Sequence, residues 1–374
     1  MKRKTWRLSR IKIRGYKSIP FTYPLVLDIG DINILLGANG SGKSNIISFF
    51  KMLGYMMTGR LQEWIARTGT NDSILYYGPK VTPTMSASLR FDDPEKTYDI
   101  YSFSLTAAAG NRVVITSEEI EWQRYSDEKR PVSIPLRGDF HESALVRNIR
   151  RIEQTVGYMV GACKVYQFSD SSATAPMRRP STVESAHYLQ SEANNLASFL
   201  YYLRKNYRAS YERITSYVRD VVPQFREFYL EPEGRYISLK WEDTSINDYI
   251  LTADQFSDGS IRFIALATLL LQPPETMPFV IIIDEPELGL HPYAIDQLNE
   301  MIRDASRHAQ IIIATQSPGI IDGFDPDDVT VIERDVEIEG TVANHLSAEE
   351  LQEWLNEYSM SELWGKNVFG GRPR

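Results

Sequence analysis

The chain has 374 residues, of which 43% are hydrophobic and 24% are charged, and its formal net charge is −8 at pH 7. This composition is ordinary for a folded globular protein, and it excludes a chain dominated by disorder. The negative charge argues against a nucleic-acid surface over the whole molecule but allows a local basic patch.

The start of the chain is basic and alternating. Ile11 and Ile13 stand between basic residues, which is the period of a half-exposed strand over residues 8–14. A secretory signal would need an apolar stretch here, so we expect a cytoplasmic protein. A solvated strand edge is the favoured explanation of the charge, and a nucleic-acid patch is the alternative. The basic residues are Lys2, Arg3, Lys4, Arg7, Arg10, Lys12, Arg14 and Lys17, with a second cluster at Arg147, Arg150 and Arg151.

A glycine-rich loop follows the increasingly apolar residues 31–36, which predict a buried strand. Gly37-Ala-Asn-Gly-Ser-Gly-Lys-Ser44 is the full phosphate-loop pattern, and a helix is expected from Lys43. In such a loop, backbone N–H groups and the helix dipole face the phosphates of ATP. We expect Lys43 to hold the β- and γ-phosphates and Ser44 to coordinate Mg²⁺. The predicted nucleotide-binding residues are Gly37, Ala38, Asn39, Gly40, Ser41, Gly42, Lys43, Ser44 and Asn45.

In the middle of the chain the spacing of the apolar residues changes twice. Alternating stretches between residues 84 and 125 predict an antiparallel β-subdomain. Residues 169–181 are rich in Ser, Ala, Pro and Arg, which predicts a loop and a hinge. Two helices are expected within residues 187–221. Their predicted apolar positions are Leu196, Phe199, Leu200, Leu203, Ile214, Tyr217, Val218 and Val221.

Four side chains near the hinge have more than one explanation. Cys163 is the single cysteine, so no intrachain disulfide is expected and a core position is favoured. Gln167 either links the nucleotide to the helical region or is an exposed polar residue at a strand end, and the second is favoured. Arg178 and Arg179 either reach phosphate or nucleic acid, or are solvated loop arginines, which is again favoured.

The last third predicts α/β order, with helices at 259–271 and 292–306 and strands at 279–283, 310–314 and 328–332. The apolar strand that ends in Asp284 and Glu285 supplies the second half of an ATPase site. We expect Asp284 to bind Mg²⁺ through water and Glu285 to act as the general base.

Two helix starts carry further signals. The segment Phe256–Ser260, called the signature turn below, can present Ser257 and Gly259 to the γ-phosphate of another subunit, or it is an ordinary N-cap. Near the end, Ser347-Ala-Glu-Glu350 has the spacing of a capping box. The helix that it opens is expected to have one apolar face, formed by Leu351, Trp354, Leu355 and Tyr358.

Several motifs together resemble the ABC-type ATPases of the structural-maintenance, recombination-repair and OLD-nuclease kind. More closely, they resemble predicted AAA-family ATPases of bacterial defence loci. The motifs are Gly37 to Asn45, Ser257-Asp-Gly259, Asp284-Glu-Pro-Glu-Leu-Gly-Leu-His-Pro292 and Ala314-Thr-Gln-Ser-Pro318. The narrower likeness includes Trp354 to Tyr358 and Leu363 to Pro373 in the tail.

The resemblance implies a P-loop NTPase head of the ABC type, with a mixed-sheet core, an antiparallel β-subdomain and a helical insertion. We accordingly expect an N-terminal ATPase lobe at 1–168, a hinge with the helical insertion at 169–250, and a C-terminal ATPase lobe at 251–374. It also implies a homodimer or higher homo-oligomer in which Ser257 and Gly259 complete the site around Lys43 of a second copy. Leu288 to His291 either cross that interface or cap a helix that begins at Pro292.

Two departures from the family pattern concern the rate of ATP hydrolysis and the contacts with phosphate. Gln316 stands where such ATPases often carry a switch histidine, so Gln316 is expected to sense the γ-phosphate and turnover is expected to be slow. Asp258 replaces the glycine usual in transporter signatures, which places its direct contact with phosphate in doubt.

The expected function is hydrolysis of ATP to ADP and phosphate, with ATP-dependent dimerisation acting as a switch in anti-phage defence. The 58 residues after Gln316 leave no room for an appended nuclease domain, so a separate effector or nuclease is expected, and DNA is a candidate partner. The alternatives are a DNA recombination or repair ATPase and a nucleotide-gated scaffold with little hydrolysis. A transporter motor is disfavoured by Ser257-Asp-Gly259 and Gln316, and no membrane partner is expected.

Overall fold

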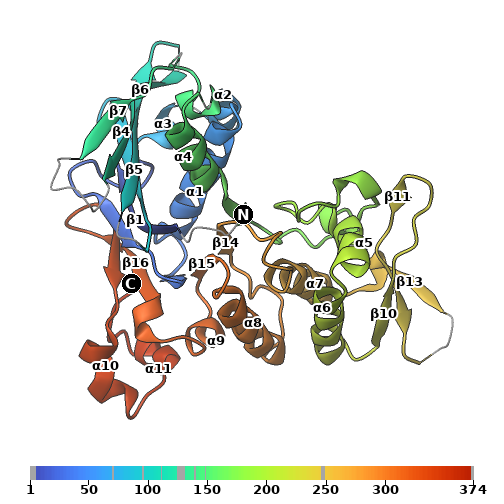
Figure 1. The fold of residues 1–374 in the computed structure, drawn as a ribbon. Helices are drawn as coiled ribbons and strands as arrows, with labels where there is room; N and C mark the ends of the chain where they lie inside the picture. Colours follow the sequence, from blue (N-terminus) through green and yellow to red (C-terminus); the bar gives the residue numbers. More distant parts are fainter. Residues whose placement is uncertain are drawn as a thin grey trace. The chain divides into compact units, whose positions relative to one another are not determined.

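The computed structural model describes residues 6–69, 71–94, 97–110, 112–123, 131–138, 140–147, 149–245 and 249–371. Lys2, Arg3 and Lys4 of the basic cluster and Pro373 of the tail lie outside these residues. The described chain forms two compact units (Figure 1). The first contains residues 6–164, 326–358 and 362–371, and the second contains residues 165–325 and 359–361. The predicted three-part division at 168 and 250 stays a prediction.

The first unit contains the antiparallel sheet that the alternating stretches predict. Its strand order is β2-β1-β4-β5-β6-β7. In β4 every second residue is buried, because one face of the sheet packs against the core. The expected strand 8–14 and the β-subdomain are therefore confirmed. The bounds are β1 Arg7–Arg14, β2 Leu25–Asp28, β4 Thr84–Asp92, β5 Tyr98–Ala108, β6 Arg112–Gln123 and β7 Val132–Pro135.

A second, mixed group of strands in this unit carries the phosphate loop. Strand β3 (Ile32–Leu36) runs parallel to β16 (Val329–Asp335), which pairs antiparallel with β17 (Gly340–His345). Helix α1 (Lys43–Met57) begins where the loop ends, and its predicted core residues Ile46, Ile47 and Phe50 are buried. On the same helix, Phe49 stacks on Phe103 of β5 with ring centroids 6.4 Å apart, within the range of aromatic pairs.

The first unit also contains several shorter helices, the last of which begins in the segment 359–361 of the second unit. They are α2 Leu61–Thr68, α3 Asn71–Ile74, η1 Ala144–Arg147, α4 Arg151–Gly161, η5 Pro326–Asp328, α10 Ala348–Leu355 and α11 Met360–Gly365. Cys163 begins β8 (Cys163–Tyr166) and is buried, as predicted. Burial raises the pKa of its thiol to about 12, so this side chain behaves as a small core residue.

Helix α10 differs from its prediction at both ends. The Ser347 side chain makes no capping hydrogen bond; instead Asp327 Oδ1 accepts the Ala348 N–H at 2.9 Å. The helix ends at Leu355, so Tyr358 lies beyond it, and Trp354 is 47% exposed. The predicted apolar face is therefore confirmed at buried Leu351 and in part at half-buried Leu355, and it is wrong at Trp354 and Tyr358, because eight residues provide only about two turns.

The second unit has a parallel pair of strands at its centre. Strands β14 (Val280–Asp284) and β15 (Gln310–Thr315) pair in parallel, and nearly all their side chains are buried. Burial on both faces explains their uniform apolar sequence. Helix α7 (Asp258–Leu270) is buried from Ile261 onwards. The helices near this pair are α8 Pro292–Ala305 and α9 Pro318–Ile321.

The two predicted helices of the insertion are present as α5 (Leu196–Asn206) and α6 (Arg208–Val221). The first of them begins at residue 196 rather than 187. The buried face of α6 consists of Tyr211, Ile214, Thr215 and Val218, so Tyr217 and Val221 lie beside this face and are half-buried. Figure 1 shows a small antiparallel sheet beside them. Its strands and the nearby short elements are β10 Phe225–Tyr229, β12 Lys240–Asp243, β13 Ile250–Thr252, β9 Ser181–Thr182, β11 Tyr236–Ile237, η2 Pro176–Arg178, η3 Val183–Ser185 and η4 Ala253–Gln255.

Among the described residues, no helix is both long and apolar enough to cross a bilayer.

Candidate nucleotide site

The phosphate loop is shaped by glycine and supported by β17. Gly42 has φ 114°, a left-handed value that favours glycine, and a Cβ there would collide with the Thr341 side chain. Thr341 Oγ1 donates to the Ser41 carbonyl at 3.0 Å. The phosphate loop therefore packs against a strand that comes 300 residues later in the chain.

The cationic and hydroxyl groups of the loop suit a phosphate ligand. Lys43 is only 4% exposed, and its Nζ donates to the carbonyls of Gly37 at 2.5 Å and Ala38 at 3.0 Å. Ser41 Oγ is buried without a hydrogen-bonding partner among the described residues. Ser44 is exposed, and the Asn45 amide donates to Ser18 Oγ at 2.7 Å.

A cavity of about 500 Å³ adjoins the loop, a volume in the usual range of small-molecule sites. The Ala38 N–H donates to the Gly371 carbonyl at 3.1 Å, so the tail borders the loop. Arg334 Nη2 donates to the Tyr77 hydroxyl at 2.9 Å on the cavity wall. Sequence reasoning assigned no role to Tyr77 or Arg334, since neither belongs to a motif. The lining residues are Ala38, Asn39, Gly40, Ser41, Tyr77, Glu333, Arg334, Asp335, Val336, Glu339 and Gly371.

The two predicted catalytic acids lie at the end of β14 in the second unit. Gln167 Nε2 donates to Asp284 Oδ2 at 2.9 Å. Gln167 is half-buried, so the favoured explanation as an exposed polar residue is wrong. Glu285 has φ 45°, and its N–H donates to the Ala314 carbonyl at 2.8 Å. A left-handed conformation is strained for a residue other than glycine and is common at functional sites.

A third acid, Glu287, lies in the same motif and received no role from the sequence. It is buried and accepts a hydrogen bond of 2.6 Å from Thr315 Oγ1. Burial raises the pKa of this carboxyl, against the opposing effect of the Thr315 hydrogen bond. Gln316 directly follows Thr315 and is half-buried.

The signature turn is an N-cap whose outer face is open. Ser257 Oγ accepts the Ser260 N–H at 3.1 Å, and both Ser257 and Asp258 are exposed. A Cβ at Gly259 would collide with the Gly289 carbonyl, so the turn packs directly on the segment after Glu287. The N-cap explanation of this turn is therefore confirmed, while its contact with the γ-phosphate of another subunit stays a prediction.

The second helix start is capped by His291. Its Nδ1 accepts the Tyr293 N–H at 3.3 Å, and Pro292 occupies the first helical position. Leu288 and His291 are both exposed. The capping explanation for this segment is therefore confirmed, while its predicted role at an interface stays a prediction.

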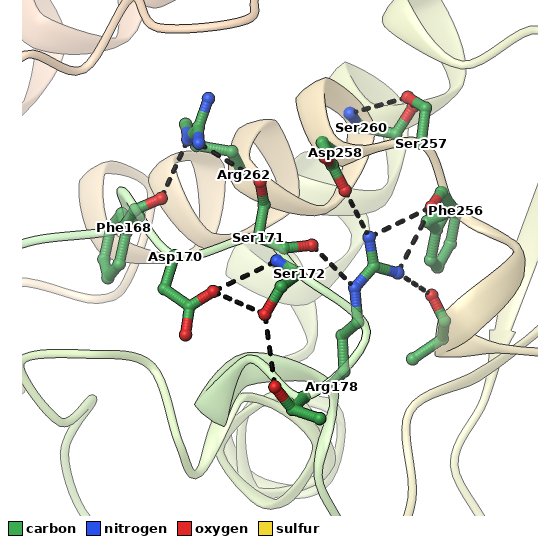
Figure 2. Close-up of polar contacts among 12 residues, drawn as sticks. Phe168, Asp170, Ser171, Ser172, Arg178, Phe256, Ser257, Asp258, Ser260 and Arg262 are labelled. Carbon is green, nitrogen blue, oxygen red and sulfur yellow. Dashed lines mark hydrogen bonds and ion pairs between the residues drawn. The ribbon is translucent and has the colours of Figure 1, made fainter.

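Two arginines hold the signature turn from inside the second unit, as Figure 2 shows. Arg178 is buried, so the favoured explanation as a solvated loop residue is wrong for it. The reason is that backbone carbonyls of Ser171, Ala253 and Phe256 converge on its guanidinium. Arg179, by contrast, is exposed, as predicted.

Arg262 of α7 ties the signature helix to the segment after Gln167. It donates to the carbonyls of Phe168 at 2.8 Å and Ser169 at 2.9 Å, and also to the carbonyl of Leu288. Burial lowers its pKa, and the charge of Asp258 opposes that effect.

A phosphate loop between a strand and a helix, with an apolar strand ending in acids and a capped signature turn, is the pattern of the P-loop NTPase fold of the ABC type. The Smc head bound to the C-winged helix domain of ScpA has this fold, with a TM-score of 0.62 at 14% identity over 93% of this chain and 99% of that chain. An Smc head with an extended coiled coil, bound to the C-terminal domain of ScpA and derived from Pyrococcus furiosus, has a TM-score of 0.61 at 13% identity, covering 94% and 99%. These likenesses confirm the predicted fold class.

The sequence also places the chain within a particular family. It belongs to the family described as "AAA domain, putative AbiEii toxin, Type IV TA system", which matches residues 32–322. No curated protein matches the sequence.

Proposed function

We propose that the chain binds ATP with Mg²⁺ at residues 37–45 and hydrolyses it to ADP and phosphate. The observation that carries this proposal is the geometry of the phosphate loop. A buried Lys43, a buried Ser41 hydroxyl that has no partner among the described residues and an adjoining cavity of about 500 Å³ suit a triphosphate and its nucleoside. Membership of an AAA-domain family supports the same ligand.

In this proposal the reaction uses the phosphate loop and the acids at the end of β14. Bound Mg²⁺ would neutralise charge on the phosphates, held by the Ser44 hydroxyl and, through a water molecule, by Asp284. Lys43 holds the β- and γ-phosphates, and Gln167 keeps the Asp284 carboxylate oriented through their hydrogen bond. Glu285 accepts a proton from water as that water attacks the γ-phosphorus, and the bond to the bridging oxygen of ADP breaks.

ATP-dependent self-association completes the proposed site. The signature turn of one copy, through Ser257 and Gly259, contacts the γ-phosphate held by Lys43 of another copy. Leu288 to His291 lie across the same interface. The exposure of Ser257, Leu288 and His291 supports this arrangement, since each is available to a second molecule. The result is a homodimer, or a higher homo-oligomer, that closes with ATP and opens after hydrolysis.

The biological role that we propose is a cytoplasmic switch in anti-phage defence that controls a separate effector or nuclease, with DNA as a candidate ligand. The family's description as a toxin of a type IV toxin–antitoxin system supports this role. The Smc heads of the two solved structures are bound to domains of ScpA, which supports a head that acts through another protein.

The Glu285→Gln variant tests the proposed reaction. Its kcat for ATP should fall about 100-fold or more, because a positioned general base contributes roughly 10²–10⁴-fold. The affinity for ATP should stay within about threefold, and ATP-dependent dimers should accumulate in sedimentation experiments. The exposed Glu300 of α8 provides a matched control, Glu300→Gln, with an unchanged rate. Hydrolysis at the normal rate in Glu285→Gln would remove Glu285 from the mechanism.

A nucleotide-gated scaffold is the second candidate, and Gln316 favours it. An amide donates to phosphate but does not titrate, so it cannot provide the proton transfers of a switch histidine. A scaffold predicts that defence against phage survives in Glu285→Gln cells and is lost in Lys43→Ala cells. A switch that requires hydrolysis predicts loss in both.

A further inference from the structure

A buried cation lies directly beneath the exposed signature turn. Arg178 Nη2 and Asp258 Oδ1 are 3.0 Å apart, and the side chains are 4% and 68% exposed, respectively. The negative charge of Asp258 thus faces outward while its counter-charge is held inside the second unit. Figure 2 shows the two groups meeting at the start of α7.

The position of this cation is fixed by backbone groups. Arg178 also donates to the Ser171 carbonyl at 3.1 Å, to the Phe256 carbonyl at 3.2 Å and to the Ala253 carbonyl. A planar guanidinium offers five donors in one rigid fork, which suits carbonyls that arrive from separate segments. The charge therefore stays at a set place relative to the turn.

The carboxylate of Asp258 poses a problem for a turn that meets a triphosphate. Two negative groups repel, and the repulsion grows where an interface excludes water. We infer that Arg178 is a positioning residue of the signature turn, which cancels the charge of Asp258 and fixes the turn so that it accepts the γ-phosphate of a second copy. This inference rests on the proposed function and adds a role for Arg178, which does not itself touch the nucleotide.

Arg262 holds the other side of the same segment. Its Nη2 donates to Ser171 Oγ at 3.2 Å, while the carbonyl of Ser171 accepts from Arg178. The loop that follows Gln167 is thereby tied to the signature turn by two cations. Only Arg178 pairs directly with Asp258, so the charge of this pair can be varied while Arg262 is left in place.

Four proteins that share the Glu285→Gln substitution test the inference through the dimer dissociation constant at saturating ATP, measured by sedimentation. They are the parent, Arg178→Gln, Asp258→Asn and the double variant. The affinity of the two copies for each other should depend on the net charge of the Arg178–Asp258 pair. We expect Arg178→Gln to weaken the dimer about tenfold, Asp258→Asn to tighten it about threefold, and the double variant to return to within about threefold of the parent. ATP affinity at Lys43 should stay within twofold in all four.

The adjacent exposed arginine provides the matched control, since Arg179→Gln removes one charge outside the pair and should leave dimerisation unchanged. Arg178→Lys, which keeps the charge and loses some hydrogen bonds, should dimerise nearly as the parent does even if its Tm falls. A double variant as weak as Arg178→Gln would overturn the inference, because Arg178 would then be a structural clamp alone. If Arg178→Gln does not fold, Asp258→Asn decides: a tighter dimer supports the inference, and an unchanged or weaker one overturns it. A parent that does not associate with ATP overturns the proposed function as well.

Discussion

The phosphate loop of the first unit and the signature turn of the second both lie at the start of a helix, but they are supported differently. The phosphate loop depends on its own glycines and on the neighbouring strand β17, whose Thr341 side chain lies against Gly42. The signature turn depends on side chains from elsewhere, above all Arg178. Both regions therefore need partners outside their motifs: the first uses a neutral side chain on an adjacent strand, and the second uses a buried cation that offsets a negative charge in the turn.

The largest effect is expected at the phosphate loop. Lys43→Ala should lower the affinity for ATP about 100-fold, because a buried charge-assisted contact to two phosphates is lost. Isothermal titration with ATP measures this change. The exposed Lys80 provides the control, and Lys80→Ala should bind ATP normally. Binding by Lys43→Ala within threefold of the unchanged protein would show that the loop does not hold the phosphates.

The support of the same loop can be tested through Gly42. Gly42→Ala should lower the free energy of unfolding by about 3 kcal/mol, because the methyl group meets Thr341 and the left-handed backbone disfavours alanine. Urea denaturation, with hydrogen exchange of α1 as a local probe, measures the loss. Gly40 also has a positive φ but open space around it, so Gly40→Ala should lose about 1 kcal/mol. Equal losses would mean that the contact with Thr341 contributes nothing.

Gly259 offers the corresponding test in the signature turn. Gly259→Ala should lower stability by about 1–2 kcal/mol, since the methyl group would displace the carbonyl of Gly289. Hydrogen exchange in α7 and α8 should report it. Gly365 of α11 has open space around its Cβ position, so Gly365→Ala should be neutral or slightly stabilising. A neutral Gly259→Ala would contradict the close packing of these two segments.

The smallest expected effect is the pH dependence of stability that Glu287 causes. Burial raises the pKa of this carboxyl, so its contribution to stability is present below the ordinary pKa and is lost as pH rises through the raised value. Glu287→Gln keeps a neutral group at every pH. Its Tm relative to the unchanged protein should therefore increase between pH 4 and pH 7.5, as measured by calorimetry. A difference in Tm that stays constant over this range would contradict the raised pKa, and Glu300→Gln serves as the control.

Local patterns predicted the core of this protein well. The phosphate loop, the apolar strand before Asp284 and the helices α5 and α6 all follow from short-range periodicity. Burial of Arg178 did not follow, because three carbonyls from sequence positions up to 78 residues away create its environment. The prediction of a capping box at the start of α10 was wrong for the same reason, since the carboxylate that accepts the Ala348 N–H belongs to Asp327, 21 positions earlier.

The contact between Ala38 and Gly371 has a practical consequence for anyone who trims or recombines this protein. A fragment cut at the end of the family match, residue 322, would retain every nucleotide motif yet lack β16, β17 and the tail that border the phosphate loop. Chimaeras should accordingly exchange residues 6–164 and 326–371 as one piece, because the motif and its scaffolding are inherited from opposite ends of the gene.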